Sequence, residues 1–117
     1  PNHSFMEKLA TYQKVLGEII ESYAAGKKSL TPEVEWQAII DHEHGQYQLL
    51  SVGWHNSRYV FTVAFHFSLK GEKVWIMQNN TDRMIADELV EKGVANHDIV
   101  LGFVPADARE ASGFAAS

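Results

Sequence analysis

Asp41-His42-Glu43-His44 is the densest group of potential metal ligands in the chain. On a strand, residues two apart point to the same face, so the imidazoles of His42 and His44 could meet one metal ion with a third ligand from elsewhere. Structural metal sites usually have four protein ligands, however, and no fourth is evident. We therefore interpret the cluster as a solvated hairpin corner and expect no metal or other cofactor. A metal-dependent hydrolase that uses His42 and His44 is kept as an alternative function.

The common catalytic motifs are absent from the sequence, which contains no G-x-S-x-G, Walker A loop, G-x-G-x-x-G or H-E-x-x-H. Ser51, Ser57 or Ser68 could be combined with a histidine and an acid, but nothing selects one such triad. His66 lies among apolar residues of a predicted strand, where a histidine satisfied by a hydrogen bond is expected. We predict a protein without enzymatic activity.

Gln78-Asn79-Asn80-Thr81 stands where a predicted strand gives way to a predicted helix. Amide side chains and free N–H groups at a helix start could bind an anion or a peptide carbonyl. The interpretation that we favour is structural, because such residues commonly cap a helix and close the turn before it.

The first element expected to position these residues is an amphipathic helix over residues 4–25, whose apolar positions are three and four apart. These positions are Phe5, Leu9, Tyr12, Leu16, Ile19, Ile20 and Tyr23. Ser4 is expected to cap the helix, with Glu7 in capping-box position, and Gly26 to end it.

Four strand-like segments follow at about 34–41, 46–54, 59–69 and 73–78, rich in β-branched and aromatic residues. The turns between them are short enough to require antiparallel neighbours, which predicts a four-stranded meander. The third segment is predicted to place six apolar residues on one face: Tyr59, Phe61, Val63, Phe65, Phe67 and Leu69. Its other face is also largely apolar, so we expect it at the sheet centre or beneath a partner, and a homodimer is one way to cover it.

A second helix is predicted over residues 81–92, with Thr81 as its N-cap and Gly93 at its end. Glu88 and Lys92 are spaced for an ion pair on that helix. Residues 94–103 predict a short helix and then an extended stretch. The chain is thus predicted to be one α+β domain over residues 1–117, in which residues 1–5 and 106–117 are peripheral. The part beyond Pro105 is expected to be loosely held, although Phe114 could anchor it.

Composition places the chain in the globular class, with 45% apolar and 21% charged residues among 117. No apolar run approaches the roughly 20 residues needed to span a bilayer, and no secretory signal is visible. The sequence has no cysteine, which fits a reducing compartment, so we expect a cytoplasmic protein. The formal net charge of −5 argues against strong non-specific binding to nucleic acid. A direct DNA-binding regulator remains an alternative, and its basic patch would be built from Lys27, Lys28, Arg58, Lys70 and Lys73.

A series of short motifs, in a particular order and spacing, resembles the XisI-like family from Met6 to Ala115. The motifs are Asp41 and Glu43 before Tyr47-Gln48-Leu49, Gly53-Trp54, Val74-Trp75-Ile76, Gln78-Asn79, Thr81, Ile85-Ala86, Glu88-Leu89, Asp98-Ile99-Val100-Leu101-Gly102-Phe103, Pro105 and Arg109. His42 and His44 are not part of this pattern. The resemblance implies an α+β fold and a role as a controlling factor in excision of the cyanobacterial fdxN element, a DNA rearrangement.

The same resemblance implies a companion protein, XisH, which is similar to nucleases. We therefore expect a non-enzymatic accessory factor that binds this type of partner, contacts DNA only indirectly and does not enter membranes. The predicted partner-binding residues are Gln78, Asn79, Thr81, Glu88, Asp98 and Arg109.

Overall fold

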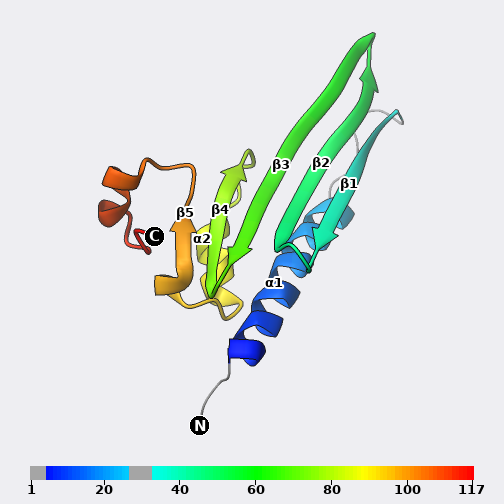
Figure 1. Cartoon of the computed structure of the whole chain (residues 1–117). Coiled ribbons are helices and arrows are strands. Elements are labelled where there is room, and N and C mark those ends of the chain that lie inside the picture. Colours follow the sequence, from blue (N-terminus) through cyan, green and yellow to red (C-terminus); the bar gives the residue numbers. More distant parts are fainter. Residues whose placement is uncertain (1–4, 27–32) are drawn as a thin grey trace.

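A long helix packed on a five-stranded sheet forms the centre of the molecule, in a computed structural model that describes residues 5–26 and 33–117 (Figure 1). The elements in chain order are α1 (Phe5–Gly26), β1 (Val34–Asp41), β2 (Gln46–His55), β3 (Arg58–Lys70), β4 (Lys73–Asn79), α2 (Ile85–Glu91), the 3-10 helix η1 (Asn96–Asp98), β5 (Ile99–Leu101) and the 3-10 helix η2 (Ala106–Ser112). The prediction of an α+β fold with an amino-terminal helix is confirmed. The proposed cap Ser4 lies outside the described residues.

The sheet has the strand order β1-β2-β3-β4-β5. The first four strands pair antiparallel with their neighbours, as the short turns predicted. The sheet has a fifth strand, which the prediction of a four-stranded meander lacked, because the extended stretch after η1 returns beside β4 and pairs with it in parallel. A parallel neighbour needs a crossover connection, and α2 with η1 supplies it.

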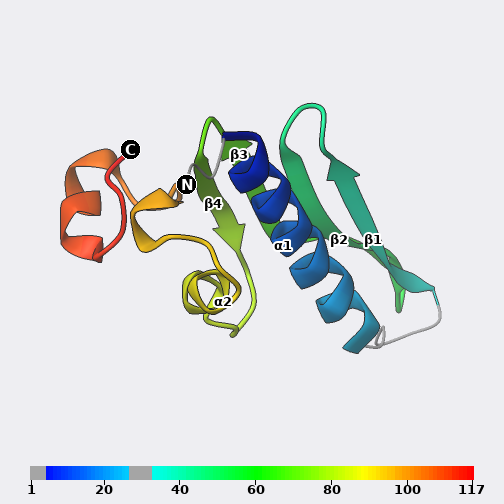
Figure 2. The same cartoon turned by 90° about the horizontal axis from the view of Figure 1, so that it is seen from below.

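The core lies between the helices and one face of the sheet (Figure 2). Leu16, Ile19 and Ile20 of α1 are fully buried against that face, which carries Tyr47, Leu49, Phe65, Phe67, Val74 and Ile76. Ile85 and Leu89 of α2 join the same cluster. No helix in the described parts of the chain is long and apolar enough to cross a membrane.

A β-bulge divides β3 into two halves with opposite orientation. Leu49 pairs with Phe65, whereas Leu50 pairs with Val63, so Ala64 is the extra residue. Since an extra residue shifts the side-chain alternation by one position, Phe65 faces the core while Phe61 and Val63 face away from it. The predicted single face of six apolar residues is therefore wrong, and Tyr59 and Phe61 are 57% and 62% exposed.

The second helix is shorter than predicted. It begins at Ile85, its N-cap position is Met84, and no side chain caps it. Thr81 is thus not the N-cap, because it belongs to a separate turn before the helix. Glu88 pairs with Arg83 rather than with Lys92, which lacks an ion pair within the described part of the chain. Gly93 follows the helix with a positive φ of 108°, as expected for a residue that ends one.

Candidate functional site

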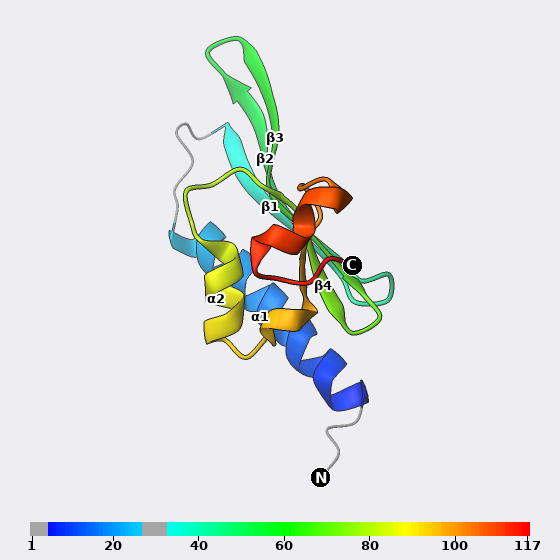
Figure 3. The ribbon, with the colours of Figure 1, turned by 90° about the vertical axis from the view of Figure 1, so that its left-hand side faces the viewer.

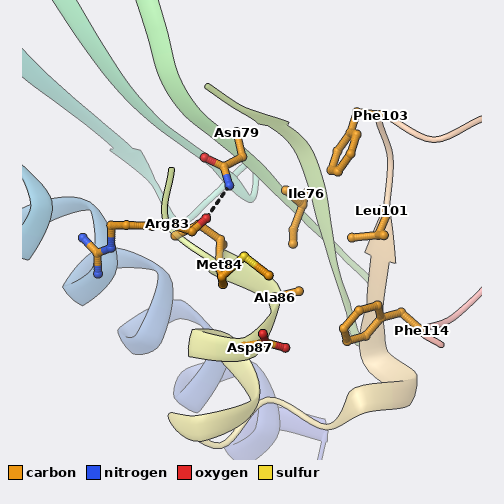
Figure 4. Close-up of a pocket in the computed structure, with 10 residues that line it drawn as sticks. Ile76, Asn79, Arg83, Met84, Ala86, Asp87, Leu101, Phe103 and Phe114 are labelled. Atoms are coloured by element: carbon orange, nitrogen blue, oxygen red, sulfur yellow. Dashed lines mark hydrogen bonds between the residues drawn. The ribbon is translucent and has the colours of Figure 1, made fainter. Parts of the chain in front are cut away.

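The turn after β4 positions α2 through the side chain of Asn79. Its Oδ1 accepts hydrogen bonds from the Thr81 backbone N–H at 3.0 Å and the Thr81 hydroxyl at 2.7 Å. Its Nδ2 donates to the Arg83 carbonyl at 2.9 Å (Figure 4). Asparagine commonly stabilises turns by such bonds to nearby backbone. The favoured structural interpretation of this segment is therefore half right, because it closes the turn without capping the helix.

Arg83 fixes the start of α2 against the rest of the fold. Its guanidinium pairs with Glu88 through two hydrogen bonds, one of them 2.8 Å between Nε and Oε2. The same group lies over the Tyr23 ring of α1, 5.4 Å from the ring centroid. Glu88 thus serves as the anchor for Arg83, and its carboxylate is engaged within the chain.

An apolar groove with a volume of about 250 Å³ lies between α2 and the β4–β5 edge of the sheet (Figure 4). Its described lining consists of Ile76, Asn79, Arg83, Met84, Ile85, Ala86, Asp87, Leu101, Phe103 and Phe114. Ile76 and Ile85 are buried, whereas Met84 is 71% and Phe103 57% exposed. Two large apolar side chains therefore stand open to solvent at the rim of a concave surface.

The carboxy-terminal segment forms the second wall of the groove. The Gly102 N–H donates to the Ile76 carbonyl at 2.8 Å, and the Ala115 N–H donates to the Ile99 carbonyl at 2.8 Å. Arg109 Nε donates to the carbonyls of Leu101 and Val104, and its guanidinium lies 5.1 Å from the centre of a Trp75 ring. Residues 106–117 are therefore tied to the sheet edge more closely than the expectation of a loosely held tail.

Asp98 lies in the interior, with 3% exposure. Its Oδ2 accepts a hydrogen bond of 2.6 Å from the Tyr12 hydroxyl and lies 2.8 Å from the Lys8 ammonium. Burial acts to raise the pKa of the Asp98 carboxyl, but the hydrogen bonds from Lys8 and Tyr12 outweigh burial and hold this pKa below its usual value. The network joins α1 to η1.

The six predicted partner-binding residues are not equivalent in the structure. Asn79 lines the groove, and the Thr81 hydroxyl donates a hydrogen bond to Asn79. Glu88 and Arg109 hold the two walls of the groove in place. Gln78 pairs with His66 on the sheet face away from the helices, and Asp98 is buried. Sequence reasoning missed Met84, whose signal was a large apolar residue outside the buried helical stripe.

The histidine-rich corner between β1 and β2 is a turn closed by its own side chains. Asp41 accepts hydrogen bonds from the His44 backbone N–H at 3.1 Å and shares one with His44 Nδ1 at 2.8 Å. His42 is turned to the Tyr47 hydroxyl, 2.8 Å from its Nδ1. The potential ligand atoms that gather within 4.8 Å come from Asp41, Glu43 and His44, so His42 is not among them. These contacts account for the corner as a structural feature.

His66 is satisfied by a hydrogen bond, which confirms that prediction. Its Nε2 lies 2.9 Å from Gln46 Oε1, and the same oxygen accepts a hydrogen bond from the Ser68 hydroxyl at 3.0 Å. Burial, and then the charge of Lys70, lowers the pKa of His66. This residue therefore has a defined structural partner on the sheet.

Comparisons with known proteins agree on one family. The family model described as XisI protein matches residues 6–116. A search of curated proteins finds no match. Among solved structures, a XisI-like protein from Anabaena variabilis has 36% sequence identity, covers 93% of this chain and 99% of its own, and superposes with a TM-score of 0.89. The fdxN element excision controlling factor XisI from Anabaena variabilis has 32% identity, with coverage of 94% and 99% and a TM-score of 0.83. This chain belongs to the XisI family.

Proposed function

We propose that this chain is a non-enzymatic accessory factor that controls excision of a DNA element by binding a protein partner, a nuclease-like companion of the XisH type. The role in excision is suggested by the similar protein that is described as an fdxN element excision controlling factor. Binding through a partner is suggested by the groove between α2 and β5, and this groove is the observation that carries the proposal.

The groove has the character of a protein-docking surface. It gathers residues from two segments that are distant in sequence, 76–87 and 101–114, and most of its lining is apolar. A partner side chain that enters the groove would cover Met84 and Phe103, which are 71% and 57% exposed. Buried apolar anchors that fill pockets of this kind dominate the energetics of many protein interfaces.

The groove is poorly equipped for catalysis. Of its described lining residues, only Arg83 and Asp87 are ionisable, and Arg83 is paired with Glu88. General acid–base chemistry needs titratable groups that converge on one reacting atom.

The formal net charge of −5 would favour association with a basic, DNA-binding partner, because complementary fields steer encounter.

The test is to co-express the chain with the nuclease-like protein encoded beside it and to measure complex formation. Met84→Ser and Phe103→Ser are expected to weaken the complex at least tenfold each, or about 1.4 kcal/mol, as for interface anchors. Met6→Ser is the matched control, because Met6 is also 71% exposed but lies at the start of α1, away from the groove.

Three results would contradict parts of the proposal. If the folded wild-type chain forms no complex, the proposed partner is wrong. If both groove variants leave the complex unaffected, the groove is not the binding surface. The chain alone is expected not to cleave DNA in the presence of divalent cations, and cleavage that survives repurification would contradict the non-enzymatic role.

A further inference from the structure

The β2–β3 hairpin extends beyond the rest of the sheet. Val34, the first residue of β1, pairs with Gly53, so the strand residues from Trp54 to Tyr59 have no neighbour in β1. Asn56 and Ser57 form the tip, with positive φ values of 48° and 68°, as in a tight two-residue hairpin. The hairpin projects away from both helices (Figure 3). We refer to its part from residue 50 to residue 63 as the arm.

One side of the arm is apolar. Trp54 pairs with Tyr59, Val52 with Phe61, and Leu50 with Val63, and directly opposed residues share a face. Leu50 neighbours the core residue Leu49 and so points to the opposite side of the sheet from the helices. On β1, Ile39 pairs with Gln48 and lies on the same side. We call this side the arm face and define it as Ile39, Val52, Trp54, Tyr59, Phe61 and Val63.

The arm face is exposed to an unusual degree. Trp54, Tyr59 and Phe61 are 56%, 57% and 62% exposed, and Ile39 is 43% exposed. The Trp54 and Tyr59 rings meet edge to face, 5.2 Å between centroids, which fixes them as one aromatic unit. A two-stranded hairpin alone is at best marginally stable in water. Its large exposed apolar side chains therefore favour burial against another surface.

We propose that the arm face is a self-association surface through which two copies of this chain form a two-fold dimer. A two-fold contact places the same patch of each copy against the other. Any charged group in the patch therefore lies close to a group of the same charge. The six residues of the arm face carry no charge at neutral pH, whereas the whole chain carries a formal charge of −5. Two ionisable residues lie at the margin of the face on the same side of the sheet: Glu35, which pairs with Val52, and His66, which pairs with Gln48. Contact through this face therefore brings fewer like charges together than contact between acidic surfaces would.

The register of the strands makes the arm face complementary to itself. The Trp54–Tyr59 pair stands at one end of the face and Ile39 at the other, with Phe61 and Val63 between them. A two-fold axis between the Phe61 and Val63 positions, with strand directions reversed, lays the aromatic pair of one copy over the Ile39 end of the other copy's face, where Ile39, Gln48 and His66 lie side by side. The arrangement thus covers the four most exposed side chains of the arm face, which are Ile39, Trp54, Tyr59 and Phe61.

The area fits a weak but specific dimer. Three strands span about 14 Å, and the face runs about 25 Å along them, so its projection is about 350 Å². Two such faces, with the relief of their side chains, bury on the order of 1,000 Å², the lower end of specific interfaces. We therefore expect association in the micromolar range of concentration, rather than a permanent dimer.

Sedimentation analysis of the purified full chain from about 1 to 300 µM, the range expected for an interface of this size, tests the proposal. The wild-type mass is expected to rise from 13.2 kDa toward twice that value. Phe61→Ser and Trp54→Ser are expected to weaken association at least tenfold, as for interface anchors, without loss of fold by circular dichroism. Met6→Ser is the control, because Met6 is 71% exposed at the start of α1, away from both the arm face and the groove.

A cross-link tests the arrangement itself, since the chain has no cysteine. In the double variant Ile39→Cys and Tyr59→Cys, the two positions are about 20 Å apart within one copy, too far for an internal disulfide. Because packed sheets lie about 10 Å apart, beyond the reach of a disulfide, the cross-link is made with a bifunctional thiol reagent that spans about 10 Å. The reagent is expected to join Cys side chains of two copies and give a covalent dimer. A wild-type chain that stays monomeric at all concentrations, a dimer that Phe61→Ser leaves unchanged, or an absence of cross-linking would overturn the proposal.

Discussion

At the scale of single residues, several side chains whose types suggest binding have internal partners. Asp98 is bound by Tyr12 and Lys8, Glu88 by Arg83, and Arg109 by main-chain carbonyls. Charged groups that order a chain in this way stabilise the surfaces beside them without contacting a ligand. The exposed residues Met84 and Phe103, which carry no charge, are the better candidates for direct contact.

Asp98→Asn is expected to lower the free energy of unfolding at pH 7 by about 2 kcal/mol, because hydrogen bonds to a charged group are weakened at a buried site. The pKa of Asp98 in the folded chain is below its usual value, owing to Lys8 and Tyr12 against the opposing effect of burial. The ionised carboxyl therefore stabilises the fold above its ordinary pKa of about 4, and this contribution is lost as the pH falls through the folded value.

Urea unfolding of the wild type and Asp98→Asn at pH 7 and at pH 3 checks this expectation. The difference between the two proteins should be largest at pH 7 and should shrink in acid. Asp107→Asn, at an exposed position of η2, is the control and should change little at either pH. An equal difference at both pH values would show that the charge of Asp98 is not what stabilises the fold.

At the scale of elements, the β2 strand depends on a glycine at the base of the arm. Gly53 has a φ of 146°, and a Cβ at this position would lie 1.8 Å from the Glu33 carbonyl oxygen. Both the backbone conformation and the close approach of the neighbouring chain exclude other residues. Gly53 thus allows β1 to begin beside the arm.

Gly53→Ala is expected to destabilise the protein by at least about 2 kcal/mol, because strain and steric conflict act together. Gly26→Ala is the matched control, since Gly26 is the last residue of α1 and a Cβ there would meet nothing within 4 Å. This control should be neutral or slightly stabilising, because alanine favours helix over glycine. Thermal unfolding of the two variants compares them directly, and equal melting temperatures would contradict the role of Gly53.

Helix α2 is an element whose stability comes from its surroundings. It has only seven residues, and helices this short do not persist alone in water. Burial of Ile85 and Leu89, the Asn79 turn and the Arg83–Glu88 pair hold it in place. The shape of the groove is therefore set by contacts outside the helix itself.

At the scale of the whole molecule, the basic residues that the structure describes from the predicted DNA-binding patch lie at two separate places. Arg58 begins β3 and Lys70 ends it, so the two lie about 40 Å apart along a strand of this length. Lys70 lies over a Trp75 ring, and Lys73 donates to the Ser117 carbonyl. Lys27 and Lys28 lie outside the described residues. Of the described members of the predicted patch, Lys70 and Lys73 thus pair across the β3–β4 turn, and Arg58 stands at the far end of β3.

We expect the isolated chain to bind duplex DNA no more tightly than about 100 µM, the weak end of non-specific binding, because the described members of the predicted patch offer only two neighbouring cations, Lys70 and Lys73, to release counterions. Fluorescence anisotropy with a labelled duplex at low and moderate salt measures this. The wild-type chain should give no saturable signal at micromolar concentrations. Saturable binding that weakens steeply as salt increases would favour the direct DNA-binding alternative.

The molecule thus has two apolar surfaces on different faces, the groove and the arm face. The groove lies between α2 and the β4–β5 edge, and the arm face lies on the side of β1, β2 and β3 away from the helices. A partner in the groove and a second copy on the arm face would not compete for the same residues.

The sequence by itself determined the local elements and the family. The period of apolar residues predicts α1 and the first four strands, and short turns permit only antiparallel neighbours, so the order β1-β2-β3-β4 followed. The ordered motifs pointed to the XisI-like family, and the match over residues 6–116 confirms it. Both inferences rest on short-range patterns, which a chain carries before it folds.

Only the tertiary structure decided features that depend on contacts between distant residues. The bulge at Ala64 is visible only in the pairing of β3 with β2, and it turned Tyr59 and Phe61 from the core to solvent. The three residues of β5 have no sequence signal that predicts parallel pairing with β4. Asp98 became buried because Tyr12, 86 positions earlier, meets it. The groove likewise exists only where α2 and β5 are packed side by side, since neither element forms a concave surface alone.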